Sequence, residues 1–232
     1  MNETISERLA ALRVQMKQSG LNAALIPQTD PHQSEYIADH WQVRRWLSGF
    51  TGSAGTLVVT ESQALLWTDS RYFLQAEEQL AGTGITLMKD GLPDTPSITT
   101  YLIQNLQKGD NVGIDGSLFS IIETSNLRSS LEKHGIKLNT GFDAIDSIWT
   151  DRPGLPATPV FIHDIKFAGE TASDKIEKIL ADAASQGANA IFISPLDEIA
   201  WTLNIRSRDV KCNPVATAFL YLSSEGSTLF IK

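Results

Sequence analysis

The stretch that decides the fold is GLNAALI at residues 20–26, because a close copy of it occurs later in the chain. The copy reads GANAIFI at residues 187–193, an offset of 167 residues from Gly20 to Gly187. Each stretch follows a helical pattern, begins with the glycine that stops the helix and continues as a short apolar run typical of a buried strand. The sequence therefore predicts one structural unit that begins a second time.

The same order of elements surrounds each copy. A helix is predicted from an N-cap at Thr4, with Glu7 three residues later, to Gly20; its counterpart is predicted from about residue 172 to 186. Downstream, each copy is followed by two β-rich runs that predict a hairpin. These runs are residues 56–60 and 64–68 in the first unit, and 218–222 and 228–231 in the second.

The first unit continues where the second does not. Further strands are predicted at 85–88, 111–114 and 137–140, and further helices at 72–80, 97–106, 120–134 and 145–149. Three prolines between Pro153 and Pro159 mark a linker. We therefore predict an α/β fold with a mixed sheet flanked by helices at 1–155 and the first half of a related domain at 156–232. Truncation is the simplest explanation of the half-copy.

Composition excludes several classes of partner. A net charge of -8 argues against nucleic acid and anionic membrane surfaces, which need clustered Lys and Arg. The 232 residues include one cysteine, Cys212, show no apolar leader at the N-terminus and contain no stretch of about 18 apolar residues that would span a membrane. A cytoplasmic protein is expected.

The glycine-rich run Gly49–Gly55 resembles two functional motifs, but the residues around it exclude both. It lacks the Lys-Ser/Thr ending of a phosphate-binding loop, and it runs into a hairpin rather than a helix. A serine-hydrolase elbow at Ser53 would also need a helix after it. A tight turn that requires glycine is the better interpretation.

Arg71 is the candidate binding residue, because Thr68–Tyr72 follows a buried apolar strand. A guanidinium suits a carboxylate or carbonyl oxygen of a peptide. The alternative is that Arg71 pairs with Asp69 or Glu77 and only clamps the structure, and the residues alone leave both possibilities open.

Two further polar groups are weaker candidates. His32 and Glu35 lie in the polar loop after the first strand, where side chains can converge on a ligand, or where they are simply solvated. No third or fourth ligand accompanies them, so we expect no metal in this chain. Asp197 and Glu198, followed by Trp201, form a similar cluster, for which packing between domains is the favoured interpretation.

Five ordered motifs together resemble the N-terminal part of the three-domain Xaa-Pro aminopeptidases (aminopeptidase P), and the resemblance covers essentially the whole chain. The motifs are DPHQSEYI at 30–37, SGFTGSAGT at 48–56, LWTDSRYFLQA at 66–76, IWTDRP at 148–153 and LDEIAW at 196–201.

The resemblance implies two creatinase-type N-terminal domains followed by a pita-bread catalytic domain that holds two divalent ions, usually manganese. None of that domain's ligands can be carried onto this sequence, so the expected catalytic residues here are none and the chain alone is expected to be inactive. Arg71 matches the family's peptide-contacting arginine, with His32, Glu35, Asp69 and Tyr72 as possible supporting residues. Ser70 stands where the family has glycine.

The implied parent activity is removal of the N-terminal residue before proline, by a metal-bridged hydroxide, from short peptides with proline in second position. This part would shape the substrate cleft and support a homodimer. The alternative is a non-enzymatic module of the same fold that binds peptides.

Overall fold

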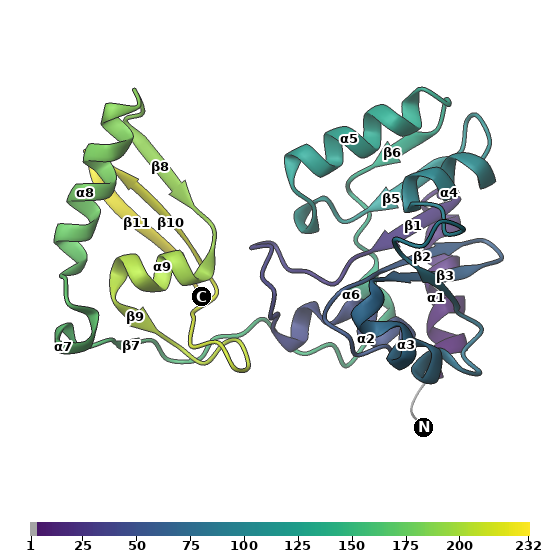
Figure 1. Cartoon of the computed structure of the whole chain (residues 1–232), viewed down its shortest axis with the longest axis horizontal. Helices are drawn as coiled ribbons and strands as arrows, with labels where there is room; N and C mark the ends of the chain where they lie inside the picture. Colours follow the sequence, from purple (N-terminus) through teal and green to yellow (C-terminus); the bar gives the residue numbers. More distant parts are fainter. Residues whose placement is uncertain (1–3) are drawn as a thin grey trace. The chain divides into compact units, whose positions relative to one another are not determined.

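The computed structural model describes residues 4–232, which form two compact units. The first unit comprises residues up to 31 and 41–152, and the second comprises residues 32–40 and 153–232. The chain therefore crosses between the units three times, at Pro31–His32, His40–Trp41 and Arg152–Pro153. No pattern in the sequence marked residues 32–40 as part of the second unit. Figure 1 follows the chain by colour through both units.

Helix α1 (Ile5–Gln18) forms as the sequence predicts. The Thr4 hydroxyl accepts a hydrogen bond from the Glu7 amide, and the Thr4 amide donates to the Glu7 carboxylate at 2.7 Å. This capping box satisfies amides that the first turn of a helix leaves without partners. Gly20, at φ 66°, then turns the chain into the first strand.

The first unit is built on a six-stranded sheet of order β4-β3-β2-β1-β5-β6. Strands β1, β2 and β3 pair antiparallel, whereas β3–β4, β1–β5 and β5–β6 pair parallel, which confirms the predicted mixed sheet. The strand bounds are β1 Ala23–Ile26, β2 Thr56–Thr60, β3 Ala64–Thr68, β4 Thr86–Lys89, β5 Asn111–Ile114 and β6 Lys137–Asn139.

Helices cover both faces of this sheet (Figure 1). Because side chains alternate along a strand, Ala24 and Ile26 of β1 pack with the helices on one face, and Ala23 and Leu25 pack with those on the other. The first face is covered by α1, α2 (Val43–Ser48), α3 (Phe73–Leu80) and α6 (Ile145–Ile148), and the second by α4 (Ile98–Asn105) and α5 (Ile121–Glu132).

The second unit contains a three-stranded sheet of order β11-β10-β8, and a short two-stranded pair, β7 and β9. Its helices α8 and α9 pack on the same face of the larger sheet, against Ile193, Leu220 and Leu222. The bounds are β7 Phe161–Ile162, α7 Ile165–Ala168, α8 Ala172–Ser185, β8 Ala190–Ile193, α9 Leu196–Leu203, β9 Ile205–Arg206, β10 Ala218–Ser223 and β11 Gly226–Ile231.

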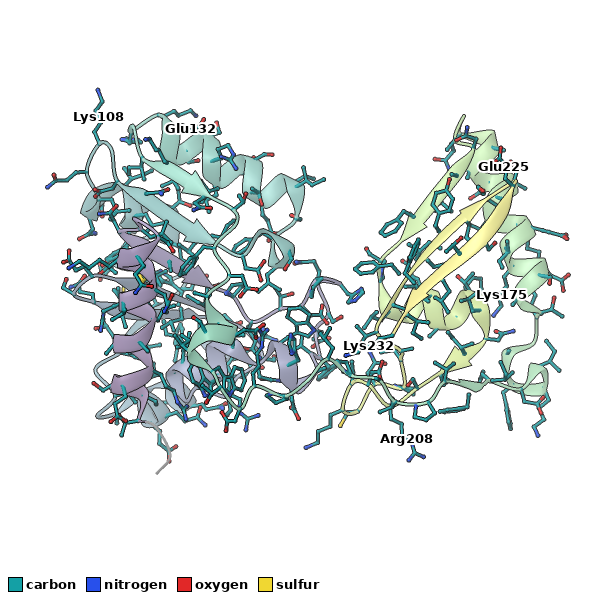
Figure 2. The ribbon with its side chains drawn as sticks, turned by 180° about the vertical axis from the view of Figure 1, so that it is seen from behind. Lys108, Glu132, Lys175, Arg208, Glu225 and Lys232 are labelled. Atoms are coloured by element: carbon teal, nitrogen blue, oxygen red, sulfur yellow. The ribbon has the colours of Figure 1, made fainter. Side chains whose placement is uncertain are left out.

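A basic residue on the first helix of each repeat shows how closely the two units repeat each other. Arg8 of α1 donates to the Trp46 carbonyl at 2.7 Å and stacks over the Trp46 ring. Lys175 of α8, labelled in Figure 2, lies 167 positions later. It donates to the Trp201 carbonyl at 2.8 Å and lies over the Trp201 ring. Each tryptophan precedes by three residues the left-handed residue that ends its helix. The predicted repeat therefore extends to individual contacts.

One face of the second unit differs from its counterpart in the first. Phe192 pairs with Tyr221 across β8 and β10, as Leu25 pairs with a residue of β2. Leu25 and Trp67 lie under α4 and α5 and are 5% and 3% exposed. Phe192, Tyr221 and Phe230 are 58%, 39% and 54% exposed. Within residues 4–232, this apolar sheet face has no helical layer, because α8 and α9 pack on the opposite face.

Helices α2 and α9 were not predicted. Helix α2 has six residues, too few to establish a periodic apolar pattern, and α9 follows Pro195 directly after a strand. The described helices include none long and apolar enough to cross a membrane.

Candidate functional site

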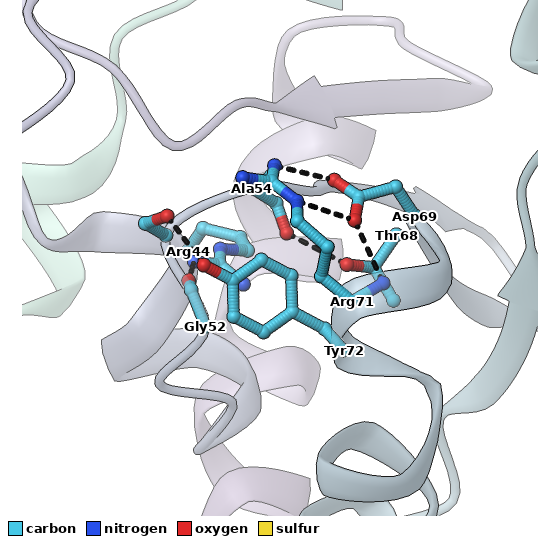
Figure 3. Close-up of polar contacts among 8 residues, drawn as sticks. Arg44, Gly52, Ala54, Thr68, Asp69, Arg71 and Tyr72 are labelled. Carbon is cyan, nitrogen blue, oxygen red and sulfur yellow. Dashed lines mark hydrogen bonds and ion pairs between the residues drawn. The ribbon is translucent and has the colours of Figure 1, made fainter.

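The candidate site lies where β3 ends in the first unit. All five residues of β3 are buried, and its last residue, Thr68, is 2% exposed. The Thr68 hydroxyl donates to the carbonyl of Ala54 at 2.8 Å. This bond ties the residues that follow β3 to the glycine-rich loop Gly49–Gly55 (Figure 3).

Asp69 orients Arg71 by two routes. Its carboxylate caps the short 3-10 turn Ser70–Tyr72 by accepting from the Arg71 amide at 3.0 Å. The same carboxylate accepts from Arg71 Nε at 2.9 Å and Nη2 at 2.8 Å, a bidentate pair. Glu77, the other predicted partner, pairs instead with Lys89 at 2.5 Å.

The ion pair sets the charge of this surface. The hydrogen bonds from Arg71 hold the pKa of Asp69 below its ordinary value, so the carboxylate stays ionised at neutral pH. The side chains remain 65% exposed for Arg71 and 37% for Asp69. Asp69 therefore neutralises a guanidinium that stays at the surface, an arrangement suited to a neutral carbonyl group.

Tyr72 connects the ion pair to the glycine-rich loop. The Arg71 guanidinium carbon lies 5.2 Å from the centre of the Tyr72 ring, and the Tyr72 hydroxyl shares a 2.7 Å hydrogen bond with the Ser53 hydroxyl. A side chain at Gly52 would overlap Phe50 and lie 2.8 Å from the Tyr72 ring. The loop therefore needs glycine for close packing, and it leads into β2 rather than a helix, as the sequence predicts.

Ser70, where the resembled family has glycine, fits its position. It lies in the 3-10 turn and is not one of the three non-glycine residues with positive φ that occur in the described chain. A side chain is therefore tolerated there without backbone strain, and Arg71 keeps its place after Asp69.

Arg44 is a residue of this site that the sequence analysis missed. It lies on α2, is fully buried, donates from Nε to Gln28 Oε1 at 3.0 Å and donates from Nη2 to the carbonyl of Gly52. Burial lowers the pKa of Arg44 to about 9. An arginine between Val43 and Arg45 gives no sign of burial in the sequence, so only a pattern of invariance among relatives would have marked it.

His32 and Glu35 belong to the second unit. His32 is 7% exposed, its Nδ1 lies 2.9 Å from the carbonyl of Ser194, and its ring lies 4.3 Å from that of Phe219. Glu35 is exposed. His32 thus contributes to packing at the end of β8, and a supporting role for either residue in binding stays a prediction.

The polar cluster after β8 has a structural explanation. Asp197 and Glu198 occupy the first turn of α9, where carboxylates suit the helix dipole. Trp201 carries the Lys175 contact, and Arg206 donates to the carbonyl of Ala200 at 2.8 Å. These contacts lie within the second unit.

The described residues do not fit a metal centre. No group of three or more His, Cys, Asp and Glu side chains between residues 4 and 232 is placed to hold an ion. The polar groups at the candidate site are a guanidinium, a carboxylate and hydroxyl groups.

A mixed sheet between helical layers, followed by a shorter copy of the same unit, places this protein among creatinase-like α/β domains. The chain belongs to the creatinase/prolidase N-terminal domain family, which it matches over residues 8–145 and again over residues 151–232.

Its relatives include enzymes that are much longer. Aminopeptidase P2 of Arabidopsis thaliana is 41% identical over 98% of this chain, which spans 32% of that protein. A probable Xaa-Pro aminopeptidase P of Laccaria bicolor is 40% identical over 97% of the chain, which spans 35% of it. The chain thus spans about a third of the length of the curated relatives it matches.

A solved structure agrees with the fold of the whole chain. The X-prolyl aminopeptidase of Caenorhabditis elegans superposes with a TM-score of 0.93 at 35% identity, over 99% of this chain and 39% of that one. That protein is described as a cytosolic enzyme with a di-nuclear active site.

Proposed function

We propose that this chain is the non-catalytic N-terminal part of a metal-dependent Xaa-Pro aminopeptidase. It shapes the substrate cleft and supports a homodimer, while hydrolysis takes place in a further domain. In this proposal, domain I covers residues 1–155 and residues 156–232 belong to a related domain II. The substrates are peptides with proline in second position, and the parent enzyme is cytoplasmic with two divalent ions, which we propose are manganese.

The observation that carries the proposal is the placement of Arg71. It follows the buried end of β3, is held bidentate by Asp69 and remains 65% exposed. Such a group offers hydrogen-bond donors in a fixed orientation to a peptide carbonyl at little cost in side-chain entropy. The relatives named Xaa-Pro aminopeptidase supply the substrate class.

The metal chemistry belongs to the further domain in this proposal. Bound ions there would activate water and polarise the scissile carbonyl. No step of hydrolysis is assigned to side chains of residues 4–232, where no cluster of ligands is found. Arg71, supported by Asp69 and Tyr72, binds and orients the peptide.

The uncovered sheet face of the second unit also supports a longer parent. Phe192, Tyr221 and Phe230 correspond to positions that helices cover in the first unit. Exposed aromatic faces of this kind normally pack against another element.

The test is Arg71→Ala in the whole enzyme that carries this chain, with Arg45→Ala as the control because Arg45 is an exposed arginine of the same unit. Loss of a substrate contact is expected to lower kcat/KM for Xaa-Pro peptides by about tenfold or more, while the control stays near wild type. Unchanged kinetics for Arg71→Ala would exclude the binding role.

A second measurement tests whether hydrolysis requires the further domain. The 232-residue chain, supplied with manganese, is expected to show no turnover of a Xaa-Pro dipeptide. Turnover that survives repurification and depends on added metal would show that the chemistry lies in this chain after all.

A further inference from the structure

Arg44 is an unusual buried cation. Its side chain is fully buried, and its Nη1 atom has no hydrogen-bond partner. Its two hydrogen bonds go to neutral oxygens, the amide of Gln28 and the carbonyl of Gly52. Burying a charge without a carboxylate opposite it is unfavourable, so a residue retained in such a place commonly has a role beyond stability.

The contacts of Arg44 converge on the glycine-rich loop. Its guanidinium donates to the Gly52 carbonyl and stacks over the Phe50 ring at 4.7 Å. Its own backbone carbonyl accepts from the Ser48 hydroxyl, which in turn accepts from the Phe50 amide. Gln28 fixes the guanidinium from the opposite side. The planar guanidinium of Arg44 thus fixes the middle of the glycine-rich loop.

The loop in turn carries Tyr72. The Phe50 and Tyr72 rings meet edge to face at 6.0 Å, and Gly52 lies so close to Tyr72 that no side chain fits between them. Ser53, next to Gly52, shares its hydrogen bond with the Tyr72 hydroxyl. Figure 3 shows Tyr72 between Arg71 and the Gly52 segment.

We propose that Arg44 is a positioning residue for peptide binding, acting through Gly52 and Tyr72 to fix the orientation of the Arg71 guanidinium. This inference rests on the proposed role of Arg71. Arg44 itself does not touch the peptide. A guanidinium suits this task because its rigid fork donates in two directions at once, whereas a lysine ammonium is a point charge on a flexible stem.

The experiment is a double-mutant cycle in the whole enzyme that carries this chain, with Arg44→Met, Arg71→Ala and both together. Arg44→Met is expected to lower kcat/KM by about tenfold, mainly through KM, and to have no further effect once Arg71 is alanine. Arg44→Lys should recover only part of the loss. Arg45→Met, next in sequence but exposed, is the matched control.

Each outcome decides a different point. If Arg71→Ala alone changes nothing, the proposed function fails. If Arg71→Ala lowers kcat/KM while Arg44→Met has no effect, the positioning role alone is overturned. The same holds if Arg44→Met lowers kcat/KM by the same factor whether or not Arg71 is alanine, because a merely structural defect acts independently of Arg71. If Arg44→Met does not fold, the same cycle with Arg44→Lys decides by the same criterion.

A readout free of enzyme activity uses the 232-residue chain. The Nε proton of Arg71, bonded to Asp69 at 2.9 Å, should exchange slowly with water in NMR spectra. Arg44→Met is expected to accelerate that exchange severalfold and Arg45→Met to leave it unchanged. Equal exchange in all three proteins would contradict the proposal.

Discussion

Replacing the fully buried Arg44 by methionine should hardly change the stability of the protein. Burial lowers the pKa of Arg44 to about 9, a shift that corresponds to about 5 kcal/mol against the charged form at neutral pH. Two hydrogen bonds to a charged group contribute about 1.5 to 3 kcal/mol each, and stacking on Phe50 contributes about 1 kcal/mol. The favourable and unfavourable contributions nearly cancel.

Arg44→Met should therefore change the free energy of unfolding by no more than about 2 kcal/mol. Urea denaturation of the 232-residue chain at pH 7 measures this quantity. Leu47→Ala is the matched control, because Leu47 is fully buried on the same helix, and its truncation should cost about 2 to 5 kcal/mol. An Arg44→Met loss as large as that of Leu47→Ala would refute the cancellation.

Three other predictions concern the repeat and the ion pair. In the 232-residue chain, Phe192→Ser should change the free energy of unfolding by less than about 1 kcal/mol, whereas Leu25→Ser should lower it by about 3 kcal/mol or more. Similar losses of both variants in urea denaturation would contradict the exposure of the sheet face that carries Phe192. Thr171→Ala and Thr4→Ala should each lower the free energy of unfolding by about 1 kcal/mol, because both hydroxyls cap a helix. A thermal unfolding temperature that is unchanged in both variants would refute the capping role. The Asp69 carboxyl should titrate below 3.8. Its depressed pKa stabilises the fold above that pH, and this contribution disappears as the pH falls through the pKa of Asp69 in the folded state. A carbon-13 NMR titration that gives a pKa at or above 3.8 would show that the ion pair does not form in solution.

The sequence was sufficient for elements whose signals are local. The capping box at Thr4, the hairpin from Thr56 to Thr68 and the glycine stop at Gly20 each depend on neighbours within a few residues, and each is present. The repeat was also visible, because both copies keep their apolar pattern. Arg71 was selected as the candidate binding residue by its place after a buried strand, and its binding role stays a prediction.

Other parts of the site depend on contacts that no local pattern encodes. Arg44 resembles any surface arginine until the chain folds around it, and it contacts Gln28 from 16 positions away. Arg71 pairs with Asp69, and Glu77 pairs instead with Lys89. Such competition among charges is decided by three-dimensional placement, which spacing in one sequence does not fix.

The nine-residue excursion at 32–40 has a consequence for how such repeats are inherited. Two copies produced by duplication can usually separate again, because one break in the gene divides them. Here residues 32–40 of the earlier copy are part of the second unit, and His32 forms a hydrogen bond with the Ser194 carbonyl just after β8. A polypeptide that began at Pro153 would lack His32 and its contact with Ser194, so the second unit as the structure has it needs residues that come before the linker.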